Sequence, residues 1–295
     1  MQVQSFYEPL TQTLTHLVYD EATKDAVLID PVLEYDPASA RTSTAFSEKI
    51  GAVITERGLH LHYSLETHPH ADHMSGATWF KRRFSAKTAI SEQVRIVQET
   101  FRPIFDLPSS FRTDGSQFDQ LLADGEVLRA GSLKIRVIAT PGHTPACVSY
   151  HIGDAVFVGD ALFMEDYGTG RCDFPRGDAK ALYHSVHDRL YALPPNTRVF
   201  PGHDYPPNGR AVRSETTIAK EIAENVQLKG DTTEEAYVAM RTARDKTLAA
   251  PRLLFPSIRI NIDGGHLPAA DGNGRRFLTL PLNPFRPSGD DGSVL

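Results

Sequence analysis

Three histidines and an aspartate lie within six positions of one short stretch, ETHPHADHMSG at residues 66–76. They are His68, His70, Asp72 and His73, in a chain with only 12 histidines among 295 residues. Imidazole and carboxylate together are typical ligands of zinc, iron or manganese, whereas calcium and magnesium prefer oxygen ligands. A single histidine is more often a surface or hydrogen-bonded residue. The dense cluster therefore indicates a transition-metal site.

Three further donors follow strand-like segments later in the chain. His143 comes after SLKIRVIAT, Asp160 after AVFVG and His203 after TRVFP, and a glycine directly precedes each of them. The first cluster also follows an alternating, strand-like run, LHLHYSLET. Ligands of open α/β sheets bind at the carboxyl ends of the strands. We therefore expect four strand ends to bring these donors to one edge of a sheet.

The remaining patterns indicate a mixed α/β protein. GDA at residues 153–155 predicts a hairpin turn between two strands. Asp178 is a plausible N-cap for the helix that follows it. Apolar periodicity predicts helices at about 38–57, 178–193, 214–226 and 233–249, with strand-like pieces beyond residue 256.

Composition and charge narrow the classes of partner. The formal net charge of −6 argues against nucleic acid or an anionic membrane surface as the main partner. The sequence has no apolar run long enough to span a bilayer, and MQVQSFYEPL does not read as a secretory signal. Cys147 and Cys172 are the two cysteines, so a disulfide framework is not expected. A reducing cytoplasm is the simplest expected location.

The motifs THPHADH, PGHT, GD and GHD, in this order, resemble those of the metallo-β-lactamase superfamily. This resemblance implies an αββα sandwich with the metal site at one edge of its two sheets. It predicts a single domain over residues 1–295 with a core at about 1–210. C-terminal helices and an extension would occupy about 211–285, and a tail of turn-forming residues, 286–295, would be flexible.

Longer motifs resemble the persulfide dioxygenase branch: AVLIDPVLE, TPGHTPACVSY, GDALF, GTGRCDF and FPGHDY. Members of this branch oxidise glutathione persulfide with O₂ and water to sulfite and glutathione at one Fe(II) per chain. The resemblance implies His68, His143 and Asp160 as iron ligands and no catalytic residue beyond the metal site. Four more donors would surround the ligands, although their equivalents bind metal in dinuclear relatives: His70, Asp72, His73 and His203.

The glutathione body carries two carboxylates and an ammonium group, so cationic residues should lie near the iron. Arg171 matches a position close to the site in this branch, and Tyr205 follows the last donor motif. An arginine fork suits a carboxylate because it can donate two hydrogen bonds at once. Weaker candidates for the same task are Tyr183, Arg213 and Arg259.

Two other functions fit parts of the pattern. A glyoxalase II-like thiolester hydrolase would use all seven donors for two metals, with Asp160 bridging them. A non-enzymatic sensor or scaffold would not need an intact donor set. A secreted lactamase is disfavoured because no export signal is apparent. The sequence leaves open the preferred persulfide, a role in sulfide detoxification or in sulfur assimilation, and assembly as a homodimer.

Overall fold

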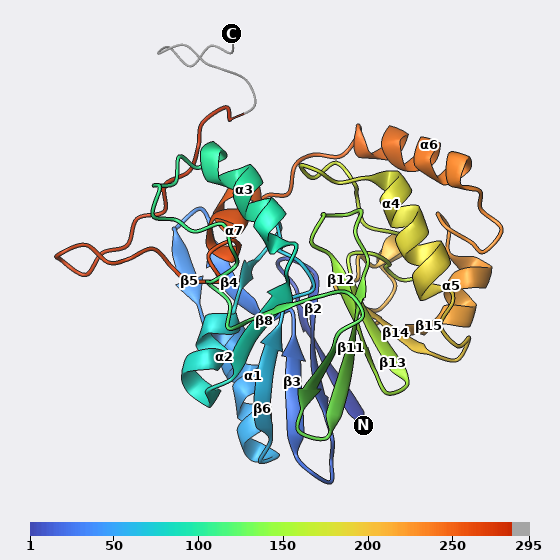
Figure 1. Cartoon of the computed structure of the whole chain (residues 1–295), viewed down its shortest axis with the longest axis horizontal. Coiled ribbons are helices and arrows are strands. Elements are labelled where there is room, and N and C mark those ends of the chain that lie inside the picture. Colours follow the sequence, from blue (N-terminus) through green and yellow to red (C-terminus); the bar gives the residue numbers. More distant parts are fainter. Residues whose placement is uncertain (285–295) are drawn as a thin grey trace.

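A computed structural model describes residues 1–284 of the chain, and two six-stranded sheets form its centre (Figure 1). The first sheet is antiparallel from β1 to β3 and parallel from β3 to β9. Its strands, in spatial order, are β1 (Gln2–Glu8), β2 (Thr13–Tyr19), β3 (Asp25–Ile29), β6 (His60–Leu65), β8 (Lys87–Ser91) and β9 (Gln120–Leu122).

The second sheet follows the chain order, and its strands β12 and β13 form the hairpin predicted around Gly153. Only the pair β13 and β14 is parallel. The strands are β10 (Val127–Ala130), β11 (Leu133–Ala139), β12 (Val148–Ile152), β13 (Ala155–Gly159), β14 (Arg198–Pro201) and β15 (Thr216–Thr217). A small third sheet has the order β5 (Arg41–Ser43), β4 (Val32–Asp36) and β7 (Met74–Ser75).

The two large sheets pack face to face through one apolar layer. Val27 and Leu65 of the first sheet share this layer with Val137, Tyr150 and Phe157 of the second. All five are buried, and such a continuous apolar layer is the main stabilising feature of a sheet sandwich.

Helices cover the outer face of each sheet, so the predicted αββα sandwich is confirmed. Helices α1 (Ala45–Glu56) and α2 (Ala77–Phe84) cover the first sheet. On the second sheet lie α4 (Ala179–His184), which continues into a π-helical turn at Ser185–Leu190, α5 (Ile218–Glu224) and α6 (Glu234–Asp245). The side chain of Asp178 caps α4, as predicted, by accepting hydrogen bonds from two backbone N–H groups.

The helix predicted at about 38–57 begins later than expected. Arg41–Ser43 pairs with β4 as the strand β5, and α1 starts only at Ala45. Glu34 explains the boundary, because its carboxylate accepts hydrogen bonds from the Ser43 hydroxyl and the Phe46 backbone N–H.

The strand-like segment PSIRIN is a helix, α7 (Leu254–Asn261), so the strand prediction was wrong there. Ile258 and Ile262, four residues apart, enter one apolar cluster, and Ile260 enters another. The helix is therefore buried on two sides, and isoleucines at every second position, which resemble a strand pattern, all find apolar contacts. Pro256 lies in the first turn, where a missing N–H does not interrupt the helical hydrogen bonds.

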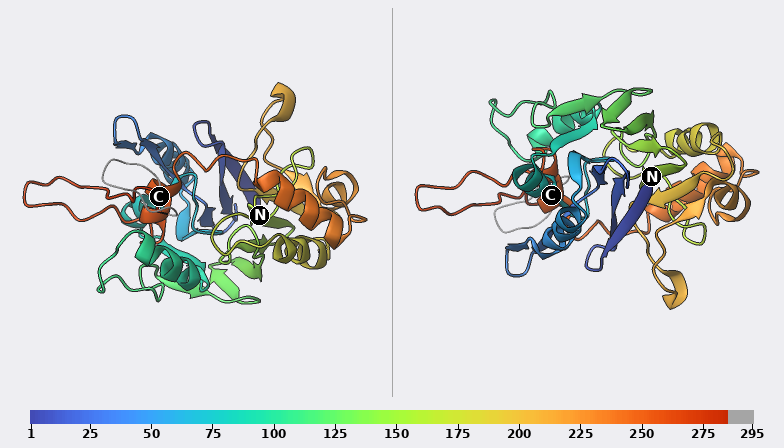
Figure 2. Two further views of the ribbon diagram at one scale, coloured as in Figure 1. Left: turned by 90° about the horizontal axis from the view of Figure 1, so that it is seen from above. Right: turned by 90° about the horizontal axis from the view of Figure 1, so that it is seen from below.

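At one end of the sandwich lie α7 and α3 (Val94–Ile104) (Figure 1), and a 3₁₀ turn spans Pro207–Gly209. The segment after α7 extends away from the body of the molecule (Figure 2). The predicted division near residue 210 stays a prediction, and the predicted tail at 286–295 lies outside the described residues. Among residues 1–284, no helix combines the length and apolar character needed to cross a membrane.

Candidate metal centre

Four loops at the carboxyl ends of strands bring the predicted donors together. The loop between β6 and β7 holds the HPHADH cluster, and His143 lies in the loop between β11 and β12. Asp160 directly follows β13, and His203 lies two residues after β14. The first loop extends from the first sheet and the other three from the second. The centre therefore lies where the ends of both sheets meet.

Three of these donors form a tight group. One donor atom each from His68, His143 and Asp160 lies within 4.8 Å of the others, and all three residues are buried. His68 Nε2 is 4.0 Å and His143 Nε2 is 3.6 Å from Asp160 Oδ2. Two imidazoles and one carboxylate facing a common point can hold one transition-metal ion.

His203 joins this group to the remaining donors. Its Nε2 lies 3.6 Å from Asp160 Oδ1 and 3.1 Å from Asp72 Oδ2. Asp72 also belongs to a second group with His70 and His73, whose donor atoms lie within 4.8 Å of one another. The structure thus brings all seven predicted donors into one region.

In three of the donor histidines, a hydrogen bond from the second ring nitrogen to a backbone oxygen fixes the direction of the ring. The Nδ1–H of His143 donates to the backbone oxygen of Arg171 at 2.6 Å, and that of His203 donates to the oxygen of Gln12 at 3.1 Å. The Nδ1–H of His73 similarly donates to the oxygen of Met74 at 3.2 Å. Such contacts leave Nε2 with a lone pair for a metal.

Several donor atoms in the described part of the chain are buried without a hydrogen-bond partner. They include Nε2 of His68, His73 and His203, Oδ2 of Asp72 and Oδ1 of Asp160. Unpaired buried polar atoms are unfavourable unless a ligand satisfies them. Burial also holds the pKa of His68 well below its ordinary value and lowers that of His73 to about 3. The neutral rings and orphaned atoms fit a bound metal ion.

His70 has a different environment from the other histidines. Its Nε2 lies 3.0 Å from Asp30 Oδ1 and 3.3 Å from Glu66 Oε2, and all three residues are buried. Burial disfavours the cationic ring, but Asp30 and Glu66 outweigh that effect and raise the pKa of His70 well above its ordinary value. His70 thus forms a buried ionic group with Asp30 and Glu66, next to the ring of His68.

Asp30 and Glu66 were not among the predicted site residues. Asp30 holds the start of the metal loop, because its carboxylate accepts from the backbone N–H and the hydroxyl of Thr67 at 2.7 and 2.8 Å. It has a φ of +50°, which is uncommon outside glycine. An aspartate directly after the buried strand AVLI was the available sequence signal.

Close backbone contacts explain two glycines beside the donors. Gly142, next to His143, has a φ of +142°, and a Cβ there would lie 2.4 Å from the backbone nitrogen of Leu182. Gly159, next to Asp160, has a φ of +51°, and a Cβ would lie 2.4 Å from the hydroxyl oxygen of Thr67. Any other residue would displace the loop that carries the neighbouring donor.

Asn261 of α7 also supports the metal loop. Its amide nitrogen donates to the backbone oxygens of His70 and His73, both at 2.8 Å, and its amide oxygen accepts from the N–H of Ser75 at 2.8 Å. Asn261 is buried and lies 191 positions from His70. The C-terminal segment therefore helps to shape a loop near the middle of the first sheet.

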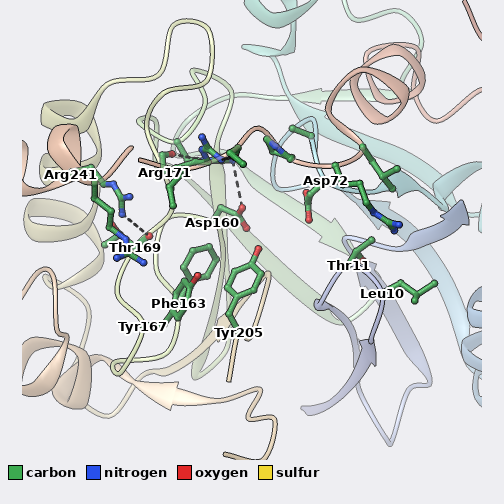
Figure 3. Close-up of a pocket in the computed structure, with 18 residues that line it drawn as sticks. Leu10, Thr11, Asp72, Asp160, Phe163, Tyr167, Thr169, Arg171, Tyr205 and Arg241 are labelled. Carbon is green, nitrogen blue, oxygen red and sulfur yellow. Dashed lines mark hydrogen bonds and ion pairs between the residues drawn. The ribbon is translucent and has the colours of Figure 1, made fainter. Parts of the chain in front are cut away.

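A cavity of about 330 Å³ opens onto the three-donor group (Figure 3). Its walls include His143, Asp160 and Asp72, the rings of Phe163, Tyr167 and Tyr205, and residues from α6 and the segment after it. The volume falls at the lower end of the range of small-molecule sites, about 300–1,000 Å³. A second, largely apolar cavity of about 370 Å³ adjoins it and shares Ala71, His143, Arg171 and Pro251.

Two of the five predicted substrate-binding residues line this cavity. Tyr205 points its hydroxyl toward Asp160 in Figure 3, and burial raises the pKa of that hydroxyl well above its ordinary value, so it stays protonated. Arg171 lines both cavities.

The other three predicted substrate-binding residues do not line either cavity. Tyr183 packs beneath α6 and donates its hydroxyl to the oxygen of Thr232. Arg213 forms ion pairs with Glu165 and Asp166. Arg259 lies on α7, 3.9 Å from Asp263.

Comparison with known proteins identifies the fold. The family model described as the metallo-beta-lactamase superfamily matches residues 9–203. The chain belongs to this superfamily. Within the metallo-beta-lactamase superfamily, it is 47% identical over 284 residues to a protein named glyoxylase B2 from Dictyostelium discoideum, covering 96% of this chain and 97% of the relative.

Similarity to persulfide dioxygenases is confirmed in both sequence and structure. The chain is 35% identical over 205 residues to the human mitochondrial persulfide dioxygenase ETHE1, covering 69% of this chain and 68% of the relative. The crystal structure of ETHE1 from Myxococcus xanthus superposes with a TM-score of 0.72 at 32% identity, covering 90% of this chain and all of that one. The superfamily match ends at residue 203, so helices α5 to α7 lie beyond it.

Proposed function

We propose that this protein is a glutathione-dependent persulfide dioxygenase with one Fe(II) per chain, held by His68, His143 and Asp160. The reaction converts glutathione persulfide, O₂ and water to glutathione, sulfite and two protons. A reducing cytoplasm, expected from the two cysteines, is part of this proposal. Both cysteines are buried and free, and burial raises the pKa of Cys147 to about 12 and that of Cys172 well above its ordinary value. Neither thiol is therefore a good nucleophile.

The observation that carries the proposal is the grouping of the donors. The imidazoles of His68 and His143 and the carboxylate of Asp160 form one group. His70 is not part of it, because its ring lies against Asp30 and Glu66. A set of two histidines and one carboxylate with open positions is typical of non-haem Fe(II) oxygenases. Relatives that are persulfide dioxygenases support the same reading.

The iron would supply redox chemistry for O₂ and an open position for a soft persulfide sulfur. The chain's own residues would orient and shield the substrate. The phenol of Tyr205 can donate a hydrogen bond beside Asp160, while the rings of Phe163 and Tyr167 form an apolar wall that limits water near the sulfur. Arg171 would hold His143 in place, because its backbone oxygen accepts the Nδ1 proton.

A thiolester hydrolase with two metals is the second candidate. Asp72, His73 and His203 have buried donor atoms without a hydrogen-bond partner in the described chain, so a second ion would have ligands close by. The name of the Dictyostelium relative, glyoxylase B2, favours the same alternative. In that case a metal-activated water would attack a thiolester carbonyl.

Metal counting and two assays separate these functions. We expect protein purified without oxygen to hold about one iron per chain, to consume O₂ with glutathione persulfide and to release sulfite. His143→Ala should lose both iron and activity, whereas His184→Ala, at an exposed histidine on α4, should retain both. Two metals per chain with hydrolysis of lactoylglutathione and no persulfide-dependent O₂ uptake would reject the dioxygenase.

A further inference from the structure

Within residues 1–284, four arginines line the cavity over the metal centre, and one of them, Arg171, already donates a hydrogen bond from each of its three guanidinium nitrogens. Nε and Nη2 donate to the two carboxylate oxygens of Asp173 at 2.5 and 2.6 Å. Nη1 donates to the backbone oxygen of Ala249 at 2.7 Å. The carboxylate of Asp173 already balances the charge of Arg171, and these contacts hold the side chain in the cavity wall.

Arg241 is occupied in a similar way. This buried arginine pairs with Asp245, at 2.9 Å from Nε and 2.5 Å from Nη2. Its Nη1 donates to the side-chain oxygen of Gln227 at 2.9 Å and contacts the backbone oxygen of Thr169. Figure 3 shows Arg241 directed at Thr169. It therefore braces α6 against the loop that follows Asp160.

Arg244 and Arg252 line the same cavity but remain available. Both are exposed, and within residues 1–284 neither side chain makes a hydrogen bond or an ion pair. Arg252 is also attracted at longer range by the exposed Asp36. One arginine ends α6 and the other lies just before α7, so the C-terminal segment places two unpaired cations beside the candidate iron site.

We propose that Arg244 and Arg252 form a carboxylate-binding site that selects acidic, peptide-like thiol carriers such as glutathione. This inference rests on the proposed function and names the part of the chain that recognises the carrier. Glutathione has two carboxylates, and a guanidinium group binds a carboxylate through paired, charge-assisted hydrogen bonds. Both arginines lie beyond the superfamily match at residues 9–203, so this recognition would be added to the common core.

The neighbouring cavity does not provide an equivalent site. Its walls include Phe101, Phe174, Pro175 and Leu254, and Arg171 is the single arginine or lysine that lines it within residues 1–284. A carrier with two carboxylates would lose hydration water there, and its carboxylates would gain no new hydrogen-bond partners. Burial of unpaired charges is unfavourable. The cavity with Arg244 and Arg252 is the better match to an acidic carrier.

Direct binding of glutathione tests the inference without requiring turnover. By calorimetry, we expect Arg244→Gln and Arg252→Gln each to weaken glutathione binding roughly fivefold to tenfold, and the double variant roughly fiftyfold. A matched control is Arg129→Gln, at an exposed position on β10 outside both cavities, which should bind like the unmodified protein. Unfolding curves should stay close together, because exposed charges contribute little to stability.

Kinetics then distinguishes recognition from chemistry. The double variant should raise KM for glutathione persulfide with kcat and iron content nearly unchanged, and it should match the unmodified protein on the persulfide of 2-mercaptoethanol, which has no carboxylate. Unchanged glutathione affinity in the double variant would overturn this inference while leaving the dioxygenase proposal intact. Absence of O₂ uptake with every persulfide, together with arginine-dependent glutathione binding, would reject the dioxygenase and retain the carboxylate site.

Discussion

At the scale of single residues, the two ring nitrogens of His143 and His203 have separate tasks. In His143 and His203, Nδ1 donates to a backbone oxygen and Nε2 faces the donor group. The tautomer is therefore set by backbone groups and not by the metal. A substitution that moves the accepting carbonyl, such as one at Arg171, would turn the ring even though the ligand itself is unchanged.

Glu221 gives a residue-scale prediction about pH. Burial, followed by repulsion from Glu165, raises the pKa of this α5 side chain to about 8, although hydrogen bonding to Asn225 and attraction to Lys220 oppose the shift. The folded protein then keeps a proton that the unfolded chain loses above about 4.5. Stability should fall as pH rises from about 4.5 to 8, because the folded state binds more protons across that window.

Glu221→Gln should remove this part of the pH dependence. The amide has the shape of the protonated acid and does not ionise, so we expect a gain on the order of a few kcal/mol at pH 8–9 and little change at pH 5. Urea unfolding of both proteins at pH 5, 7 and 9 measures this difference in the free energy of unfolding. Glu224→Gln, at an exposed position on the same helix, is the control. Equal gains at pH 5 and pH 9 would contradict the assignment.

At the scale of elements, α7 packs on the metal loop through its isoleucines and holds the loop backbone through the side chain of Asn261. Asn261 donates two hydrogen bonds to backbone oxygens of the loop, and nothing local in the sequence links these segments. We expect Asn261→Asp to weaken metal binding about 10- to 100-fold, as is typical for residues that orient ligands. The carboxylate keeps the shape but cannot donate, so it leaves two buried carbonyls unpaired.

Competition with a chromophoric chelator measures this metal affinity. Asn196→Asp, at an exposed loop position, makes the same chemical change away from the site and should bind metal normally. Normal metal affinity in Asn261→Asp would mean that the loop holds its shape without the hydrogen bonds from Asn261.

The elements also show how far the sequence could predict this molecule. Strand ends that carry His143, Asp160 and His203 were predicted correctly because each follows a strand within a few residues. The roles of Asp30 and Asn261 were missed, since they depend on contacts between distant parts of the chain. PSIRIN was misassigned because a helix buried on two sides has no single apolar face to detect.

At the scale of the whole molecule, the metal centre joins the two sheets. His68 comes from the first sheet, and His143, Asp160 and His203 come from the second. The arginines proposed to bind the substrate carboxylates lie in a third region, on α6 and just before α7, and α7 also supports the metal loop through Asn261. Metal binding, cavity shape and C-terminal packing should therefore change together.

Removal of the metal should accordingly destabilise the entire fold. Without an ion, buried donor atoms in the described chain are unpaired and the two sheets lose a shared link at one end. A ligand present at 100 times its dissociation constant stabilises the folded state by about 2.7 kcal/mol. One kcal/mol shifts Tm by roughly 2–4 °C in domains of 150–250 residues.

We therefore expect chelation to lower Tm by about 5–10 °C, and stoichiometric Fe(II) to restore it under anaerobic conditions. His143→Ala should melt at the same temperature with and without chelator. If the unmodified protein also shows no shift, and metal analysis confirms that the ion has left, the centre does not link the sheets energetically.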